Sequence, residues 1–294
     1  MQEKQVYFKN SLLSYWLLLP QLIVTFLFFF WPAAQAIKSS FEREDPFGFA
    51  TTFIGFENYV TVLSDPAYLK SLFTTAVFSL SVTVVSMSLS LLFAVCVDRV
   101  IHTKRAYTTL LLWPYAVAPV LAGILWLFIF HPTIGVIPFL LEKIGIVWNY
   151  RINGTHAMIL IVVAACWKQI SYNFLFFLAG LQSIPRSQIE AAAIDGANPF
   201  KRFWTVVFPQ ISPTTFFLLI VNINYVMFDT FGIIDNITSG GPARATSTLV
   251  YKVYDDGFKN QIIGASAAQS TILMLMVIVL TFIQFRLIER RVQY

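Results

Sequence analysis

Long apolar runs alternate with shorter polar segments along the whole chain. A helix of about 20 mostly apolar residues is long enough to cross the hydrocarbon core of a bilayer. Runs of this kind cover residues 12–31, 73–97, 106–130, 157–181, 213–235 and 263–285. None of them shows the alternation of apolar and polar positions that a strand of a membrane β-barrel requires. The pattern therefore predicts an all-α, polytopic membrane protein with six transmembrane helices.

Several prolines lie within or beside these runs, namely Pro20, Pro32, Pro114 and Pro119. Transmembrane helices tolerate proline because neighbouring helices and polar side chains can bond the backbone groups that it frees. We therefore expect the helices to be kinked at these positions and not broken.

The composition agrees with lipid as the surrounding solvent. Of the 294 residues, 57% are hydrophobic and 12% are charged, and the mean hydropathy is +0.70. A typical soluble domain contains about twice that share of charged residues. The net charge of +5 comes from basic residues that cluster at the ends of apolar runs. This clustering is a signal of membrane topology, and it does not indicate a nucleic-acid partner.

The distribution of lysine and arginine predicts the orientation, because cytoplasmic loops of membrane proteins retain positive charge. With the N-terminus inside, the inner segments are 1–11, 98–105, 182–212 and 286–294. They carry 11 basic residues in 59 positions, whereas the outer segments 32–72, 131–156 and 236–262 carry eight in 94. We therefore expect a multi-pass protein with both termini in the cytoplasm.

No pattern of residues indicates catalysis or a bound cofactor. The chain contains no Gly-x-x-x-x-Gly-Lys-Ser/Thr motif, so it lacks the usual means of holding ATP phosphates. His102, His131 and His156 fall in connecting segments without metal-ligand spacing, and Cys96 and Cys166 fall within apolar runs. We expect no catalytic residue, no metal site and no cofactor on this chain.

The long inner segment 183–209 carries the most informative pattern. Pro185 and Ser187 can begin a helix, the run Glu190-Ala-Ala-Ala favours one, and Gly196 can end it. A second short helix is predicted after Gly196, with apolar residues at helical spacing from Phe200 onward. One interpretation is an amphipathic segment that rests on the membrane surface. The other is a segment that contacts a second protein.

The segment Glu190-Ala-Ala, Asp195-Gly196-Ala, Phe203 and Phe208-Pro209 resembles the EAA signature of permease subunits of binding-protein-dependent ABC importers. Leucine is commoner than phenylalanine before the final proline. The resemblance implies a type I ABC importer permease fold, with residues 1–294 as one transmembrane permease domain and 183–209 as its cytoplasmic coupling loop. The residues implied to couple to a partner ATPase are Glu190, Ala191, Ala192, Asp195, Gly196, Phe200 and Phe203.

The resemblance extends to residues 45–48, 113–119, 167–177 and 238–242, which are similar to the maltose-type branch of sugar importers and within it to permeases for sn-glycerol-3-phosphate. It implies a bacterial inner-membrane location and sn-glycerol-3-phosphate, with glycerophosphodiesters, as substrates. The implied partners are a second homologous permease in a heterodimer, two ATPase subunits that hold ATP and magnesium, and a periplasmic solute-binding protein. Related permeases carry neutral sugars or oligosaccharides, so a neutral substrate is an alternative.

Lys168 lies near the middle of the fourth run, where an ionisable side chain is a functional candidate by default. Tyr172 and Asn173 lie within a turn and a half of it. An ammonium group attracts phosphate, and hydroxyl and amide groups bond polyol oxygens, so these three residues are candidates for the substrate path. A structural ion pair between Lys168 and Asp229 is the alternative. In an ion-coupled secondary transporter the same pair would couple the ion, but the sequence shows no inverted repeat.

Asn222, Tyr225 and Asp229 share one face of the fifth predicted helix, because their spacing is three and four residues. They are therefore further candidates for a polar substrate path. Asparagine also bonds between transmembrane helices without touching solute, and the sequence leaves both interpretations open.

Overall fold

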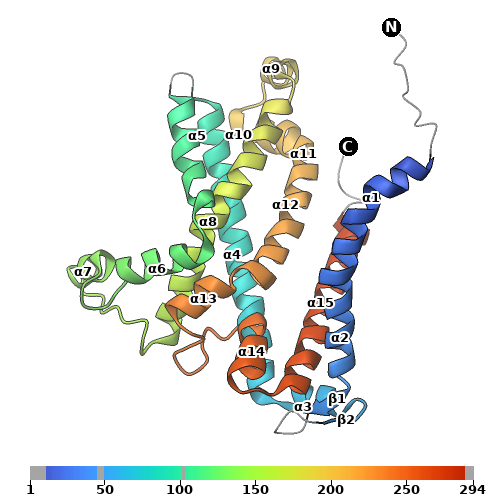
Figure 1. The fold of residues 1–294 in the computed structure, drawn as a ribbon. Helices are drawn as coiled ribbons and strands as arrows, with labels where there is room; N and C mark the ends of the chain where they lie inside the picture. Colours follow the sequence, from blue (N-terminus) through green and yellow to red (C-terminus); the bar gives the residue numbers. More distant parts are fainter. Residues whose placement is uncertain (1–10, 45–49, 101–102, 289–294) are drawn as a thin grey trace.

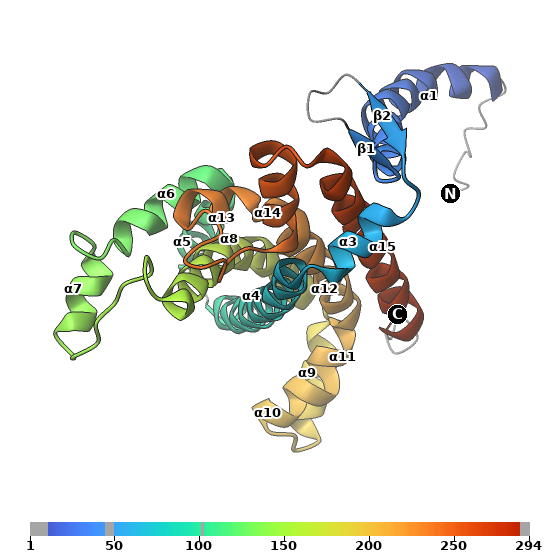
Figure 2. The same cartoon turned by 90° about the horizontal axis from the view of Figure 1, so that it is seen from below.

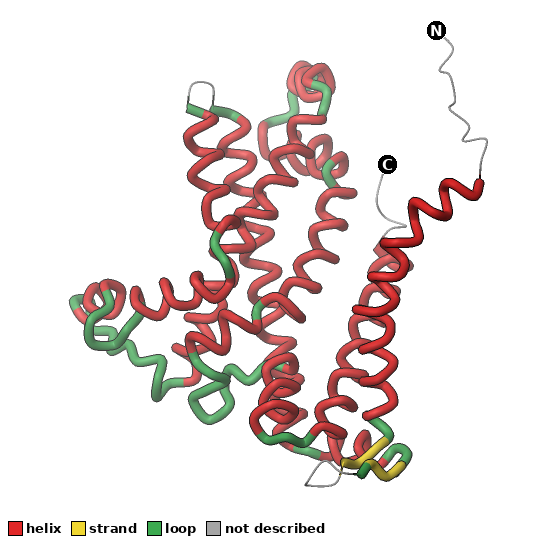
Figure 3. The backbone as a smooth tube through the Cα atoms, in the orientation of Figure 1, coloured by secondary structure: helices red, strands yellow, loops and turns green. Residues whose placement is uncertain are grey.

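The computed structural model describes residues 11–44, 50–100 and 103–288, and nearly all of this chain is helical (Figure 1). The first helix is continuous through α1 (Ser11–Thr25), the π-helical turn η1 (Phe26–Phe30) and α2 (Trp31–Ser39). A small antiparallel hairpin follows, with β1 (Glu42–Glu44) paired to β2 (Thr51–Phe53). Figure 3 shows these two strands at one tip of an otherwise helical molecule.

The middle of the chain forms the centre of the bundle. Its elements are α3 (Glu57–Ser64), α4 (Pro66–Asp98), α5 (Lys104–Leu112), the 3₁₀ turn η2 (Trp113–Ala116), α6 (Pro119–Ile129), α7 (Val136–Glu142) and α8 (Gly154–Ser183). Helices α4 and α8 pack along each other more extensively than any other pair. They bury fully enclosed side chains such as Phe78, Val82, Leu160 and Phe174.

The C-terminal part begins with a group of short helices. These are α9 (Arg186–Ile194), α10 (Pro199–Arg202), the π-helical turn η3 (Phe203–Val207) and α11 (Phe208–Gln210). The remaining elements are α12 (Ser212–Asn224), η4 (Tyr225–Asp229), α13 (Phe231–Ile237), α14 (Leu249–Tyr254), η5 (Asp255–Lys259) and α15 (Ile263–Ile288). Helix α15 packs against α2, and α12 lies against α4 and α8.

Among the described residues, six segments are long and apolar enough to cross a membrane when each bent pair of helices is counted as one span. The four straight ones are Tyr15–Ser39, Pro66–Asp98, Gly154–Ser183 and Ile263–Arg286. The two bent pairs are Lys104–Ala116 with Pro119–Ile129 and Pro199–Gln210 with Ser212–Asp229. The all-α, six-span prediction is therefore confirmed, although the boundaries differ by several residues. The first helix runs on to Ser39, and α4 begins at Pro66 because Asp65 caps its N-terminus.

The third predicted span, residues 106–130, is broken and not kinked. Its two halves meet at an angle of 103°. Val117 and Ala118 between them are extended, with ψ of 129° and 143°. The residue before a proline disfavours helical geometry, and Pro119 also lacks an N–H, so the helix stops at Ala116 and restarts at Pro119. The expectation of a kink at this pair of prolines was wrong, whereas α1 does continue through Pro20.

The start of α1, the ends of α4 and α15, and helix α9 all lie at the same end of the bundle (Figure 1). The β-hairpin, α3 and α14 lie at the opposite end. Seen from below, α6 and α7 extend to one side and α1 to the other, with α4, α8 and α12 between them (Figure 2). The described residues of the segments expected on the inner side of the membrane, which include 103–105 and 182–212, thus share one end of the molecule.

A buried lysine holds the other end together. The Lys252 ammonium lies 2.8 Å from Asp256 and 3.2 Å from Asp65, and its side chain is only 9% exposed. Gln269 of α15 donates to the same Asp256 carboxylate at 2.6 Å. Asp65 also accepts the N–H of Ala67 at 2.8 Å, which caps α4. These contacts join the first residues of α4 to α14, η5 and α15.

The Asp65 carboxyl makes the contacts around Lys252 dependent on pH. Burial raises the pKa of Asp65, but the N–H of Ala67 and the Lys252 ammonium lower it by more, so the pKa lies below the usual range. A carboxyl group whose pKa is lower in the folded state stabilises the fold at pH values above its pKa in the unfolded state. This stabilisation is lost as the pH falls through its pKa in the folded state. We expect Asp65→Asn, which preserves the helix cap, to lower the unfolding temperature at neutral pH and to lose this effect below about pH 4.

Thermal unfolding of the purified chain in detergent micelles at a series of pH values measures this dependence. Glu44→Gln in the exposed hairpin is the matched control and should show no such change. A difference between wild type and Asp65→Asn that stayed constant across the acid range would contradict the expectation.

Candidate functional site

The turn between α9 and α10 is set by a glycine. Gly196 has a φ of +80°. Its N–H donates to the carbonyl of Ala193 at 3.1 Å, and the N–H of Ala197 donates to the carbonyl of Ala192 at 3.1 Å. This pair of bonds is a Schellman motif, which ends α9 and reverses the chain. A Cβ at position 196 would meet no atom within 4 Å, so backbone conformation and not space calls for glycine.

Local chemistry also begins the second short helix. The side chain of Asn198 accepts the N–H of Lys201 at 2.8 Å, and Pro199 occupies the first turn, where a missing N–H costs nothing. The two short helices expected within residues 183–209 are therefore present, with Gly196 between them.

Several contacts attach this pair of short helices to the bundle. Ile184 is buried and Ile189 packs against the same apolar cluster, which lies between the ends of α4 and α8 and the start of α12. On the other side, Gln210 of α11 donates to the Gln188 side chain of α9 at 2.7 Å. A displacement of α9 would therefore be carried to both α8 and α12.

Three aromatic rings pack together in η3 and α11, the elements that connect α10 to α12. The ring of Phe203 lies 5.2 Å from that of Trp204, and Trp204 lies 4.9 Å from Phe208. Phe200 reaches Trp204 at 6.3 Å but remains 74% exposed. The apolar residues at helical spacing from Phe200 onward thus form an aromatic cluster with Phe200 at its outer edge. Trp204 was not among the predicted site residues.

The outer surface of α9 is exposed in this subunit. Glu190, Ala191, Asp195 and Gly196 are exposed, and Ala192 is half-buried. Ile194 is 87% exposed, which is unusual for a large apolar side chain, and sequence reasoning did not single it out. Ile194 follows the half-buried Ile189 by five residues, or about 140° around a helix, and this spacing was the available signal. The surface offers an apolar end beside two carboxylates.

Two asparagines in the middle of the bundle bond directly to each other. Asn222 Nδ2 donates to Asn173 Oδ1 at 2.8 Å, and Asn173 Nδ2 donates to Asn222 Oδ1 at 3.1 Å. The Ser86 hydroxyl donates to Asn222 Oδ1 at 2.9 Å, so α4, α8 and α12 meet in one network. All three side chains are fully buried. This arrangement supports the interpretation of these asparagines as interhelical contacts.

Tyr225 lies in the same interior. Its hydroxyl donates to the carbonyl of Ala165 at 3.3 Å, and its side chain is buried. Of the three residues predicted to share a face of the fifth span, Asn222 and Tyr225 point into the subunit. Asp229, at the end of η4, is exposed.

Lys168 closes the break in the third span. Its ammonium donates to the carbonyl of Val117 at 2.7 Å and to that of Tyr115 at 3.3 Å, and it lies 5.6 Å from the centre of the Tyr115 ring. These are carbonyls that lose their helical partners where the chain becomes extended. In the part of the chain that the structure describes, Lys168 and Asp229 form no ion pair within 4.0 Å.

An aromatic surface surrounds this lysine. The ring of Tyr172, one helical turn further along α8, lies 5.6 Å from that of Tyr115. Trp167 lies 6.0 Å from Trp113 in an edge-to-face arrangement. Lys168 and Tyr172 are half-buried, so they remain partly accessible. The structure thus divides the predicted path residues into an accessible group, Lys168, Tyr172 and Asp229, and an enclosed group, Asn173, Asn222 and Tyr225.

The asparagine network predicts a measurable loss of stability. We expect Asn222→Leu to lower the free energy of unfolding by about 1–2 kcal/mol, because leucine fills the space but leaves the Asn173 amide and the Ser86 hydroxyl without this partner. Thermal unfolding of the purified chain in detergent micelles measures the change.

Asn224→Leu is the matched control for this substitution. Asn224 lies two residues further along α12 and donates only to Ile220 of its own helix, at 2.9 Å. It should therefore change the unfolding temperature much less. Equal effects of the two substitutions would show that the network does not stabilise the bundle.

Within residues 11–44, 50–100 and 103–288, no three or more His, Cys, Asp or Glu side chains are grouped so that they could hold a metal ion. Cys166 is buried and Cys96 is exposed, and neither is part of a disulfide.

The fold and the EAA-type segment define a membrane permease, and comparison with known proteins gives its family. Residues 67–294 match the family described as binding-protein-dependent transport system inner membrane component. The chain belongs to this family. It is therefore a multi-pass inner-membrane subunit of an ABC importer, and its role is transport and not catalysis.

Individual relatives are similar over the full length. The sn-glycerol-3-phosphate transport system permease protein UgpA of Rhizobium meliloti is 58% identical over 291 residues, which cover 99% of each chain. The protein of the same name from Escherichia coli is 51% identical over 294 residues, which cover 100% of each chain.

A solved structure confirms the fold. It is a bacterial alginate ABC transporter in complex with an alginate pentasaccharide-bound periplasmic protein. One of its chains matches with a TM-score of 0.82 and 20% identity, covering 96% of this chain and 95% of that one. The type I importer permease fold implied by the sequence is therefore confirmed.

Proposed function

We propose that this chain is the permease subunit through which an ATP-driven importer carries sn-glycerol-3-phosphate, together with glycerophosphodiesters, into the cytoplasm. The observation that carries the proposal is identity of 51–58% over essentially the whole chain to permeases named for this substrate. Similarity of this extent includes the residues of the spans as well as those of the coupling loop.

The accessible group at the break in the third span suits such a substrate. The Lys168 ammonium has three N–H donors, and the structure assigns two of them to the carbonyls of Tyr115 and Val117. The third donor is available to a phosphate oxygen. The hydroxyl of Tyr172 lies on the same accessible side and can bond a polyol oxygen.

The assembly we propose contains a second, homologous permease, two ATPase subunits with ATP and magnesium, and a periplasmic solute-binding protein. The accessible group, Lys168, Tyr172 and Asp229, is only partly enclosed by this subunit. A second permease that packed against the same face would enclose it in a substrate cavity. The start of α1, the end of α15 and helix α9 share one end of the bundle, which supports both termini in the cytoplasm.

Residues 183–209 would transmit the movement of the ATPase. The exposed surface of α9 and Phe200 docks on the ATPase, with Glu190 facing a basic partner and Ile194 and Phe200 supplying apolar contact. Rigid elements carry such displacements better than loops do. Because α9 is attached to α8 through Ile184 and to α11 through Gln210, closure of the ATPases would shift α8 and α12 and alternate the access to the substrate cavity.

The test is ATP-dependent uptake of labelled sn-glycerol-3-phosphate into proteoliposomes that contain the complete assembly and its binding protein. A labelled neutral disaccharide is the comparison substrate, and vesicles without ATP are the background. Uptake of the phosphate ester alone would support the proposal. Uptake of the disaccharide alone would overturn the substrate assignment and leave the family assignment intact.

A further inference from the structure

Two adjoining cavities lie between the ends of α4 and α8 and residues 183–209, the proposed coupling loop, which is called the coupling segment below. The first has a volume of about 410 Å³ and reaches α10 and η3, and the second, of about 880 Å³, reaches α5 and α9. Their shared walls are formed by Asp98, Arg99, Leu181, Ile184 and Ile189. Cavities of this size hold small ligands in many proteins. Neither belongs to the accessible group around Lys168.

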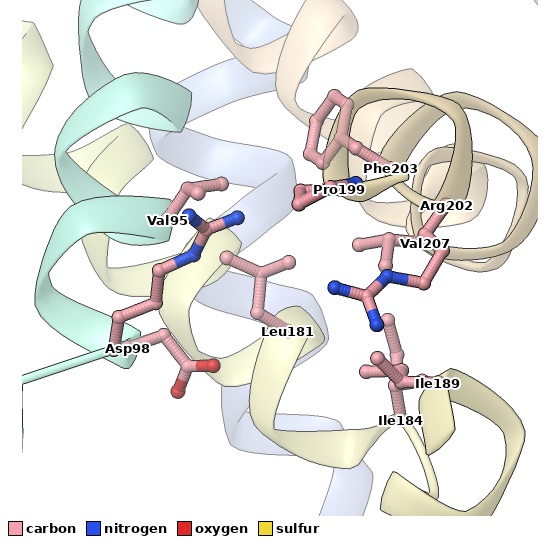
Figure 4. Close-up of a pocket in the computed structure, with 10 residues that line it drawn as sticks. Val95, Asp98, Leu181, Ile184, Ile189, Pro199, Arg202, Phe203 and Val207 are labelled. Carbon is pink, nitrogen blue, oxygen red and sulfur yellow. The ribbon is translucent and has the colours of Figure 1, made fainter. Parts of the chain in front are cut away.

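The lining combines an apolar wall with basic groups. Figure 4 shows Val95, Leu181, Ile184 and Val207 around the first cavity. In the same view the guanidinium group of Arg202 extends from α10 into this space. Arg99 at the end of α4 lines both cavities, and Lys104 and Arg186 line the second.

The acidic residues of the lining do not neutralise these arginines. Asp98 bonds the Lys104 ammonium at 3.1 Å. Glu190 also lines the second cavity, but it is exposed and makes no ion pair with a described residue. Over the described residues, the guanidinium groups of Arg99, Arg186 and Arg202 make no ion pair and no side-chain hydrogen bond.

The usual excess of positive charge on the cytoplasmic side explains why basic residues occur at this level but not why three of them line connected cavities. Arg105 and Lys201 lie at the same end of the bundle, and neither lines either of these two cavities. They show that basic residues here can also be placed on the open surface.

We propose that these cavities bind the headgroup of an anionic phospholipid. The ends of α4 and α8, both long enough to cross a membrane, place Arg99 and the cavity floor at the level of the headgroups. Arginine bonds phosphate through a planar pair of N–H groups, and basic pockets between transmembrane helices on the cytoplasmic side suit anionic headgroups. An acyl chain would continue along the apolar wall of Val95, Leu181 and Val207 into the membrane.

Such a lipid would also join two parts of the molecule. Arg99 belongs to the core of the bundle, whereas Arg202 belongs to the coupling segment. A phosphate between them holds the coupling segment in a fixed position relative to α4. This consequence rests on the proposed coupling function, whereas the binding site itself does not.

The first experiment measures binding. The purified assembly is exchanged into detergent that contains dioctanoyl phosphatidylglycerol, dioctanoyl phosphatidylcholine or inorganic phosphate, and bound ligand is counted by native mass spectrometry. The double variant R99Q/R202Q is compared with R105Q/K201Q, which removes the same charge outside the cavities. We expect phosphatidylglycerol to be retained by wild type and by the control, and retention by R99Q/R202Q to fall at least tenfold.

Equal retention of phosphatidylglycerol by R99Q/R202Q and the control would overturn the proposal. So would equal retention of the two lipids, because the headgroup charge would then have no effect. Inorganic phosphate that bound the cavity arginines and displaced the lipid completely would identify a soluble phosphate and not a lipid as the ligand. An R99K/R202K variant that retained the lipid would show that loss in R99Q/R202Q reflects charge and not misfolding.

The second experiment measures the consequence. ATPase activity of the assembly in nanodiscs of phosphatidylcholine is compared with activity in nanodiscs that also contain phosphatidylglycerol. We expect stimulation by the anionic lipid in wild type and in R105Q/K201Q, and none in R99Q/R202Q. Lipid binding without stimulation would overturn the link to coupling and leave the site in place.

Discussion

Replacing Glu190 by lysine will reduce ATP-dependent uptake more than tenfold while leaving the subunit folded. Glu190 is exposed on α9 and has no side-chain partner among the described residues, so the substitution breaks no contact within the subunit. Lysine is as good a helix former as glutamate, and α9 should therefore keep its length.

We expect Glu190→Lys to weaken the docking of α9 on the ATPase. In the proposed assembly Glu190 meets a basic group of the ATPase in a desolvated interface. Removing one member of such a pair costs about 2–5 kcal/mol, and reversing its charge adds repulsion. Each 1.4 kcal/mol is about a factor of ten in the equilibrium constant for docking. The expected loss is therefore well above tenfold.

Uptake into proteoliposomes and copurification of the ATPase with the tagged subunit measure the effect. Glu142→Lys is the matched control, because Glu142 is exposed at the end of α7, away from the coupling segment. It should leave both readouts unchanged. Undiminished uptake with Glu190→Lys would show that α9 does not couple through this carboxylate.

The structure of the coupling segment follows from signals that act within a few residues. Gly196 ends α9 because its φ of +80° suits glycine, and Asn198 with Pro199 begins α10. Such local chemistry is visible in the sequence, so both short helices could be predicted. Which face of α9 is exposed depends on packing against distant parts of the chain. The sequence therefore did not identify Ile194 as an exposed residue.

The break in the third span shows where the sequence pattern is insufficient. Hydropathy treats residues 106–130 as one run, and a single proline in such a run usually bends a transmembrane helix without ending it. Here Pro119 restricts Ala118 to an extended conformation, and Val117 before it is extended as well. What makes the break tolerable is a donor from another helix, and hydropathy carries no information about such a partner.

The partners of the polar residues within the spans are equally non-local. Asn173 and Asn222 bond to each other across 49 positions of sequence, and Lys168 bonds Val117 across 51. The sequence identified these residues as unusual because polar groups in a membrane are costly. It could not decide which of them face solute and which face another helix.

Lys168→Met is expected to lower both the stability of the subunit and its transport. The substitution removes the donors to the carbonyls of Tyr115 and Val117, which then lie at a helix break without these partners. Hydrogen bonds to charged groups contribute about 1.5–3 kcal/mol, and polar contacts between transmembrane helices contribute less, about 0.6 on average. We expect a loss of about 1–3 kcal/mol in the free energy of unfolding.

Arginine at the same position separates the structural role from the role in the substrate path. Lys168→Arg keeps a positive charge and several N–H donors, so it should restore most of the stability that methionine loses. The guanidinium group of arginine is larger and planar, so its positive charge would lie at a different position relative to the proposed substrate cavity. We therefore expect Lys168→Arg to raise the KM for sn-glycerol-3-phosphate uptake more than it lowers kcat.

Uptake kinetics and thermal unfolding of the same preparations distinguish the possible outcomes. Lys143→Met, on an exposed lysine after α7, is the control for loss of a cation and should change neither measurement. If methionine lowers stability and arginine restores both stability and KM, Lys168 closes the helix break and does not contact the substrate. If methionine leaves stability unchanged but abolishes uptake, its bonds to the two carbonyls contribute nothing, and its charge acts on the phosphate alone.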